Sequence, residues 1–409
     1  MITKNNKDMP DEFNNEKDNL VPEKQVTEKQ LKRKSPWLAS FLNLFLLGLG
    51  HVYAGKIKKG VFIYLGLIFI LLSIRFFAYS FHILVGLFAV IICYYLFAII
   101  DAFKSVKRKP YVSPKKYDKW YVYLSIILLQ MIFISFLPKG SLNNITPIFF
   151  ISIPTTSMSP TLQAGDYGTI ERTKNIRLND IVVFKYPQDT NTLFVFRCLS
   201  MPGDSLEIIN GLAYVNKKLV DNIEKLKFQY FITTNGDAIN QRLFDKHGIT
   251  DYYQVGDYYY LVFITEKEAK ELAKNTIVKE INKVTASKDH SLMLFPKSDT
   301  ICTVDNYGPI YIPQKGKEIK LTRINIGIYA SYIQQENENC LISDSIVKIN
   351  NQVITDYRFK NNYYFLIGDN RHNARDSRYW GFITEDYIIG KGLYLYWSKK
   401  PDRIGCKIE

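Results

Sequence analysis

Two long apolar runs constrain this chain more than any other feature of its sequence. Residues 61–79 and 83–100 are each close to the roughly 20 residues that an α-helix needs to cross the hydrocarbon core of a bilayer. Only a short segment separates them, with Arg75 and His82 near the expected turn. The two runs therefore predict a transmembrane helical hairpin.

Two further apolar segments flank this hairpin. Residues 120–138 begin with aromatic residues of the kind found at membrane interfaces and end at a proline, so they predict a transmembrane anchor. Residues 36–50 are shorter, contain Gly48 and Gly50, and have basic residues on both flanks, so a re-entrant or interfacial segment is favoured over a true span. Residues 36–119 would then form a membrane module with a basic loop.

Positive charge gathers on one side of the predicted spans. The formal charge is +14, and the loop between the second and third spans contains Lys104, Lys107, Arg108, Lys109, Lys115, Lys116 and Lys119. Because cytoplasmic loops are rich in Lys and Arg, this loop and the polar tail 1–35 are expected in the cytoplasm, with everything after residue 139 outside it. The charge is thus explained by topology and gives no reason to expect a nucleic-acid partner.

Residues 140–409 alternate short β-branched and aromatic runs with turn signals, a pattern typical of antiparallel β structure. Strands are expected at residues 181–186, 193–199, 206–216, 258–264, 309–313, 345–354, 363–368 and 391–397. Asn210-Gly211 and Asn350-Asn351 lie between apolar runs and predict tight hairpins, because these residue types tolerate positive φ. The predicted fold is therefore a membrane-anchored, mostly β protein with N-terminal transmembrane helices.

One helix is expected inside this β domain. Thr265, with Glu268 three residues later, matches a capping box, and apolar residues from Ala269 to Val284 recur at helical spacing. This helix would pack within an inserted α+β subdomain, residues 221–344. The insertion would interrupt a β core of residues 140–220 and 345–409.

Four short segments of the β domain carry candidate functional residues: 153–166, 179–184, 196–204 and 368–382. Taken alone, the first three are common turn or strand patterns. The fourth is more specific, because so many polar groups directly after an apolar strand must satisfy one another by hydrogen bonds and ion pairs. The five cysteines form no C-x-x-C pair, so a structural metal site is not expected.

In this order behind a membrane anchor, the four segments resemble the conserved boxes of the signal peptidase I family. These are membrane-bound serine endopeptidases that remove signal peptides from exported proteins. The resemblance covers about residues 140–220 and 340–409, and the Gly-rich run 48–55 resembles an extra membrane module of some bacterial members. It implies a multi-pass protein of the bacterial inner membrane, with signal peptides of exported preproteins and the lipid bilayer as partners and with no metal or other cofactor.

The resemblance also implies roles for single residues. Ser157 would be the nucleophile, and Thr155 would lend a hydroxyl to the oxyanion hole. Donors of this type are typically worth ~3–4 kcal/mol in the transition state. A further set would brace the site structurally: Asp369, Asn370, Arg371, Asp376 and Arg378.

The general base departs from the family pattern. Bacterial members carry a lysine directly before the arginine of the third segment, and here that position is Phe196. The serine that usually hydrogen-bonds this lysine is Ala374. The two differences agree, because without the amine a buried hydroxyl at position 374 would lack a partner at a cost of ~1–3 kcal/mol. A positioned base contributes roughly 10²–10⁴ in rate, so proteolysis is expected to be impaired or absent.

Three other side chains are weighed as substitutes for the missing lysine. His372 is a weak alternative base, because a loop histidine of this kind is expected to face solvent. Lys185 is expected to be an exposed strand lysine, and Cys198 is expected to face the packed side of its strand. No substitute is favoured.

The sequence is compatible with three functions. The first is an impaired or inactive family member that still recognises the extended segment near a cleavage site by adding it as a strand beside its own. The second is an active signal peptidase I that uses Ser157 with a displaced general base. The third is a non-enzymatic accessory subunit with a membrane complex as its partner.

Overall fold

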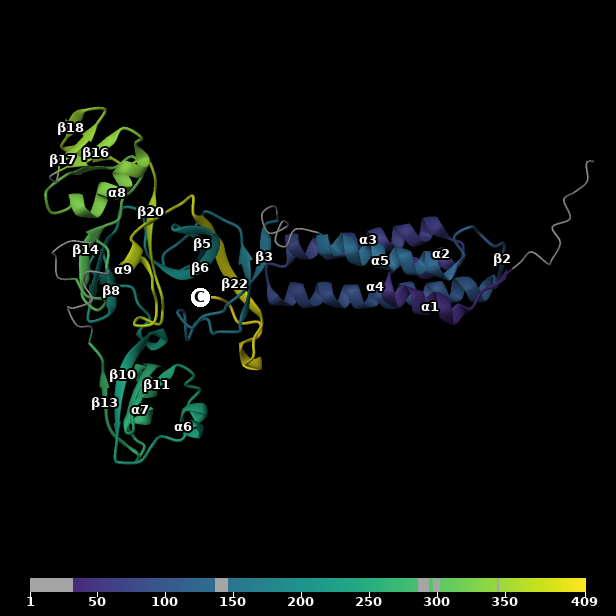
Figure 1. The fold of residues 1–409 in the computed structure, drawn as a ribbon, viewed down its shortest axis with the longest axis horizontal. Helices are drawn as coiled ribbons and strands as arrows, with labels where there is room; N and C mark the ends of the chain where they lie inside the picture. Colours follow the sequence, from purple (N-terminus) through teal and green to yellow (C-terminus); the bar gives the residue numbers. More distant parts are fainter. Residues whose placement is uncertain (1–31, 137–145, 286–293, 297–301, 344–345) are drawn as a thin grey trace, which may run out of the picture. The chain divides into compact units, whose positions relative to one another are not determined.

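In the computed structural model, the chain divides into two compact units: residues 1–71 with 89–138, and residues 72–88 with 139–409. The structure describes residues 32–136, 146–285, 294–296, 302–343 and 346–409. The first unit is helical, and the second is largely antiparallel β sheet (Figure 1). Most of the predicted tail 1–35 lies outside the described residues. Its end forms strand β1 (Lys32–Arg33), which pairs with β2 (Tyr111–Val112).

The helices match the predicted apolar runs. They are α1 (Pro36–Phe45), α2 (Leu49–Tyr53), α3 (Ile57–Phe77), α4 (Phe81–Arg108) and α5 (Trp120–Phe136). Within the described residues, α3 and α4 are the two helices long and apolar enough to cross a membrane. With 10 residues, α1 is about 15 Å long, only half of the ~30 Å hydrocarbon core.

Asn43 fixes the turn between α1 and α2. Its side-chain amide donates to Ala98 O of α4 (2.8 Å), and its Oδ1 accepts from the backbone N–H groups of Gly48 (3.1 Å) and Gly50 (2.8 Å). Gly48 has a φ of 95°, and a Cβ atom there would lie 2.2 Å from Gly60 O on α3. Glycine is therefore required where this turn meets α3.

A seven-stranded antiparallel sheet, in the order β21-β20-β6-β5-β22-β4-β3, forms the centre of the second unit. Its strands are β3 (Ile148–Ser152), β4 (Tyr167–Glu171), β5 (Ile181–Tyr186), β6 (Asp189–Ser200), β20 (Tyr363–Ile367), β21 (Ile383–Thr384) and β22 (Ile388–Trp397). Strand β3 is an edge strand, paired only with β4 among the described strands.

The two predicted tight hairpins are confirmed. Strands β7 (Ser205–Ile209) and β8 (Leu212–Val215) are joined by Asn210-Gly211, and β17 (Ile346–Ile349) and β18 (Gln352–Ile354) by Asn350-Asn351. All four turn residues have positive φ, between 50° and 83°. Paired positive φ values match the right-handed twist of the flanking strands.

Smaller sheets surround the central one. One contains β7, β8, β9 (Lys218–Leu219) and β14 (Tyr307–Tyr311). Another contains β10 (Lys227–Thr234), β11 (Tyr252–Gly256), β12 (Tyr259–Thr265) and β13 (Val278–Lys283), and has its own apolar core together with α6 (Gln241–Lys246) and α7 (Glu266–Leu272). Strands β15 (Glu318–Lys320) and β19 (Asp356–Arg358) form a pair, and β16 (Cys340–Ser343) joins β17 and β18.

The predicted helix after Thr265 is correct at its start and wrong at its end. Its capping box with Glu268 is present, but α7 ends at Leu272, and residues 278–283 form β13 against β10. The apolar residues in this stretch are β-branched, and β10 offers a strand to pair with, so sheet pairing overrides the helical spacing. Helices α6 and α8 (Ile326–Glu336) were not predicted, although the buried residues Tyr329 and Ile333 of α8 have helical spacing.

Candidate active site

Ser157 lies on the loop between β3 and β4. Two backbone hydrogen bonds of 2.8 Å close this loop at its base, from Ile153 N to Asp166 O and from Gly165 N to Ile153 O. Inside the loop, Met158 is 2% exposed and packs into the core. The loop is therefore anchored on both sides of Ser157.

The Ser157 hydroxyl has one close side-chain partner. Its Oγ atom lies 3.1 Å from Oγ1 of Thr155, and either hydroxyl can be the donor of this hydrogen bond. Among the described residues, no ionisable side chain lies within hydrogen-bonding distance of Ser157 Oγ.

The fourth segment holds the serine loop in place. Asn370 N donates to Ser157 O (3.0 Å), and the Asn370 side-chain amide donates to Thr156 O (3.2 Å). The Asn373 side-chain amide donates to Thr156 Oγ1 (3.1 Å). The fold thus brings together two segments that are more than 200 residues apart, as the predicted site requires.

Phe196 and Ala374 both lie beside Gly368, as does the Ser157 carbonyl. A Cβ atom built on Gly368 would lie 2.3 Å from Ala374 Cβ, 2.7 Å from Ser157 O and 3.3 Å from Phe196 Cε1. Phe196 and Ala374 are 4% and 5% exposed. Both side chains are therefore buried around Gly368, close to the Ser157 backbone carbonyl.

Phe196 belongs to an aromatic cluster. Its ring centroid lies 6.1 Å from that of Phe184, 6.0 Å from that of Phe194 and 6.5 Å from that of Trp380. Such edge and tilted contacts are favourable beyond the burial of apolar area. Position 196 is thus occupied by a packed aromatic ring.

The tight contact at Gly368 gives a testable prediction. Gly368→Ala is expected to destabilise the protein by about 1–3 kcal/mol, because the added methyl group overlaps both Ala374 and the Ser157 carbonyl. A thermal melt of the purified full chain measures this effect. The matched control is Gly327→Ala on α8, where a Cβ atom meets nothing within 4 Å. Equal melting temperatures for the two variants would contradict the packing described at Gly368.

Two bidentate ion pairs brace the site. Arg197 donates to both carboxylate oxygens of Asp369 (2.8 and 2.7 Å), and Arg378 donates to both oxygens of Asp376 (2.8 and 2.7 Å). Asp376 Oδ2 also accepts from Gly368 N (3.0 Å). The buried Asp376 carboxylate therefore fixes the backbone at the point where Ser157, Phe196 and Ala374 meet.

Arg371 provides a third buried pair farther from the serine. Its guanidinium lies 2.5 Å from Asp221 Oδ1 and also donates to Gly211 O (3.0 Å). Both charged side chains are 1% exposed. This pair connects the fourth segment to the β7–β8 hairpin.

His372 does not face solvent, contrary to the sequence-based expectation. Its side chain is 6% exposed, Nδ1 accepts from Gln229 N (3.1 Å), and Nε2 lies 2.7 Å from Asp305 Oδ1. Because a backbone N–H points at Nδ1, the proton of the neutral ring is on Nε2 and is donated to the carboxylate. Both ring nitrogens are occupied, so this ring has no lone pair for a serine proton.

The other two weighed residues lie where they were expected. Lys185 is exposed on β5, and Cys198 is fully buried on β6. Burial raises the pKa of the Cys198 thiol, so the thiol stays protonated at neutral pH.

Sequence reasoning missed one buried lysine near the fourth segment. Lys227 is 4% exposed, and burial lowers the pKa of its amine. Its backbone N donates to Asp369 O (3.0 Å), and its backbone O accepts from Arg371 N (2.8 Å). The Lys227 side chain does not line the groove at Ser157. In the sequence, the only sign that this lysine is buried is its position directly before the apolar strand residue Phe228.

A groove of about 730 Å³ opens at Ser157. Residues 150–158 and 192–196 supply most of its lining, which is largely apolar. Among the described lining residues, Arg375 carries the only ionisable side chain, and an arginine does not accept a proton at ordinary pH. The groove can hold an extended peptide, but its walls supply no general base.

The family model "Signal peptidase, peptidase S26" matches residues 122–270 and 299–397, which is more than half of the chain. The chain belongs to this signal peptidase family. The predicted family is therefore confirmed, and family membership supports a role in signal peptide processing.

Similar proteins include bacterial signal peptidases I. The chain is 26% identical to signal peptidase I of Buchnera aphidicola subsp. Schizaphis graminum over 63% of this chain and 74% of the relative. It is 24% identical to signal peptidase I of Aquifex aeolicus over 61% of this chain and 75% of the relative. These matches agree with a family member that has apolar N-terminal helices and a largely antiparallel β domain.

Proposed function

We propose that this signal peptidase family member binds the cleavage-site segment of signal peptides at the outer face of a bacterial inner membrane and cleaves it slowly or not at all. One observation carries the proposal. Phe196 fills the position next to Ser157 where the family places the lysine base, and no ionisable group of the described chain reaches the serine hydroxyl. Without a base the serine hydroxyl is a poor nucleophile.

The retained parts of the site favour binding over turnover. The Thr155 hydroxyl still lies beside Ser157, and the serine loop is held by the fourth segment. An extended peptide can add to the edge of β3, which among the described strands pairs only with β4. Main-chain hydrogen bonds would then provide affinity, and the apolar groove would receive alternate side chains.

We further propose that α3, α4 and α5 span the membrane, with the lysine-rich loop before α5 in the cytoplasm. The turn between α3 and α4 supports this orientation, because it contacts the β domain within the same compact unit. Tyr394 Oη donates to Ala78 O (2.8 Å), and the Arg75 guanidinium lies 5.4 Å from the ring of Phe150, which lines the groove. The hairpin turn and the groove then share the outer side.

The experiment described below also distinguishes two other functions. An active enzyme with a displaced base is favoured by the desolvated amine of Lys227, although its side chain lies outside the groove. A non-enzymatic accessory subunit would use the β domain as a contact surface for a membrane complex.

The experiment measures cleavage and binding separately. The full chain and its Ser157→Ala variant are purified in detergent and offered a fluorescently labelled preprotein. We expect cleavage by the unmodified chain to stay within about tenfold of the Ser157→Ala background, because a positioned base is worth 10²–10⁴ in rate. We expect the two proteins to bind the signal peptide equally.

Three results would lead to other conclusions. Clear cleavage that Ser157→Ala abolishes would refute the proposal. Loss of that cleavage in Lys227→Gln, but not in the exposed control Lys185→Gln, would then assign the displaced base. Absence of both cleavage and binding, with a partner protein co-purifying from native membranes, would point to an accessory subunit.

A further inference from the structure

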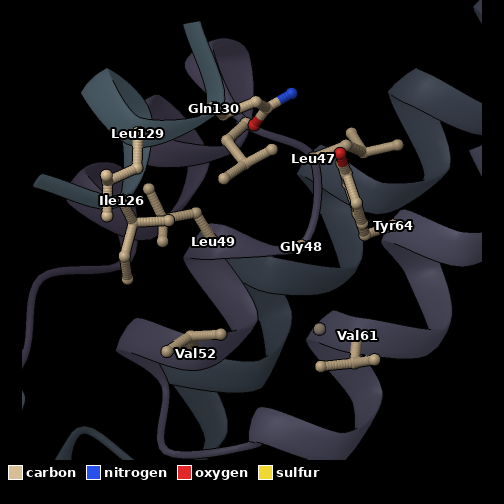
Figure 2. Close-up of a pocket in the computed structure, with 11 residues that line it drawn as sticks. Leu47, Gly48, Leu49, Val52, Val61, Tyr64, Ile126, Leu129 and Gln130 are labelled. Carbon is tan, nitrogen blue, oxygen red and sulfur yellow. The ribbon is translucent and has the colours of Figure 1, made fainter. Parts of the chain in front are cut away.

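The helical unit contains an apolar pocket that the proposed peptidase function does not use. It has a volume of about 380 Å³ and is lined by residues of α2, α3 and α5 and of the turn before α2. Figure 2 shows Leu49 and Val52 on one wall, Val61 and Tyr64 on another, and Ile126 with Leu129 on a third. Two of the lining residues have polar groups in their side chains, Tyr64 and Gln130.

A second hollow is lined by the start of α3, the residues just before it and the loop before α5. It has a volume of about 500 Å³ and is lined by Gly55, Lys56, Ile57, Lys58, Lys59, Lys115 and Tyr117. Four of these seven residues are lysines. The lining of this hollow is therefore cationic, unlike that of the apolar pocket.

The residues that line the two sites lie close together along the chain. Lys58 and Lys59 precede Val61 and Tyr64 on α3 by only a few residues, a rise of about 3–9 Å along the helix. On the other side, Tyr117 lies just before α5, which supplies Ile126 and Leu129 to the apolar pocket. A molecule with an anionic end and an apolar chain would match the lysine-lined hollow with its anionic end and the apolar pocket with its chain.

The acidic side chains near the hollow do not cancel its charge. Asp101 is shared between His51 (2.7 Å) and Lys59 (2.6 Å), and Asp118 is paired with Lys34 (2.6 Å). Lys56 Nζ donates to the neutral Ser105 hydroxyl (3.1 Å). Among the described residues, the amines of Lys58 and Lys115 have no carboxylate partner. Positive charge therefore remains available to a ligand.

We propose that this module binds one anionic phospholipid, with its headgroup phosphate in the lysine-lined hollow and an acyl chain in the apolar pocket. Basic pockets between helices on the cytoplasmic side of a membrane recognise anionic headgroups in this way. The inference rests on the membrane placement proposed above, because only that placement brings the hollow to the headgroup level of the cytoplasmic leaflet.

Charge selects the lipid over a signal peptide as the occupant. A signal peptide also has an apolar stretch that would fit beside Val61 and Leu129, but its start is positively charged. The lysines that line the hollow, of which Lys58 and Lys115 have no carboxylate partner among the described residues, would repel that start and attract a phosphate. The apolar pocket is thus assigned to an acyl chain.

The test measures lipid binding to the full chain in detergent by native mass spectrometry. Phosphatidylglycerol is titrated against phosphatidylcholine with the same acyl chains. We expect preferential binding of phosphatidylglycerol, and Lys58→Gln with Lys115→Gln is expected to weaken it about 30-fold. Lys104→Gln with Lys107→Gln, which removes two exposed lysines outside the hollow, is the matched control and should change binding less than twofold.

The apolar half is tested by filling the pocket. Val61→Trp places a large ring in it and is expected to weaken phosphatidylglycerol binding about tenfold, whereas Phe62→Trp, at an outward position of the same helix, should have no effect. Thermal melts confirm that each variant is folded. Glycerol 3-phosphate, which has the phosphate but no acyl chain, should not compete.

Several outcomes would overturn the inference. They are equal binding of both lipids, equal losses in the two lysine double variants, or displacement of the bound lipid by a synthetic signal peptide. Lipid selectivity without preprotein binding would refute the proposed function alone. Preprotein binding without lipid selectivity would refute the lipid site alone.

Discussion

Phe196→Lys combined with Ala374→Ser is expected to raise Ser157-dependent cleavage of a preprotein by about 10²–10⁴-fold over the unmodified chain. Phe196, Ala374 and the Ser157 carbonyl all lie around Gly368, so we expect the introduced amine and hydroxyl to lie near Ser157. The surroundings of Phe196 are dry, and burial would lower the pKa of the new amine, which a neutral general base requires.

The pH dependence of this double variant follows from the same burial. A lysine accepts the serine proton only when it is neutral, so the rate should be low below the pKa of the amine and rise as the pH rises through it. The lowered pKa moves that rise toward neutral pH. A pH–rate profile of preprotein cleavage measures it, and adding Ser157→Ala should remove the activity at every pH.

Single variants serve as controls for the paired change. Phe196→Lys alone should yield less activity than the double variant, because the amine then lacks the hydroxyl that orients it. Ala374→Ser alone should leave cleavage unchanged and cost ~1–3 kcal/mol for an unpaired buried hydroxyl. A folded double variant that binds signal peptides but cleaves no faster would contradict the assignment of the missing base to position 196.

Asp376→Asn is expected to destabilise the β domain by about 3–5 kcal/mol. The substitution keeps the side-chain shape but leaves the Arg378 guanidinium fully buried without a counter-charge. It also weakens the acceptor for Gly368 N, so the backbone beside Ser157 loses its support. The melting temperature of the purified chain should fall by roughly 6–20 °C.

An exposed ion pair provides the matched control for this prediction. Arg358 and Glu318 are 3.2 Å apart, with 69% and 53% of their side chains exposed. Glu318→Gln should change stability by less than about 1 kcal/mol, because solvent screens such pairs. Similar shifts in the two variants would argue against a special role of the buried pair.

Local sequence patterns were sufficient for much of the fold. The apolar runs predicted the long helices α3 and α4, and strands such as β5 have the predicted bounds. The hairpin at Asn210-Gly211 was predicted for the same reason. In each case the decisive interaction lies within a few residues, so neighbouring residues along the chain contain the information.

Other elements depended on partners that are distant in the sequence. Residues 278–283 have apolar positions at helical spacing but form a strand, because β10 offers an edge for pairing. His372 was expected in solvent and is buried, because Asp305 and the backbone of Gln229 supply its hydrogen bonds. The fate of a polar side chain depends on such partners, which local sequence does not specify.

For the candidate site, the sequence by itself determined which side chains are present. They are a serine with a nearby threonine, a group of charged residues that must pair when buried, and Phe196 at the position where the family resemblance leads us to expect a lysine. Tertiary structure decided what these groups can do together. It placed Ser157, Phe196 and Ala374 around Gly368 and occupied both nitrogens of His372. Proton transfer requires atoms within about 3 Å, and only the packing of segments more than 200 residues apart sets such distances.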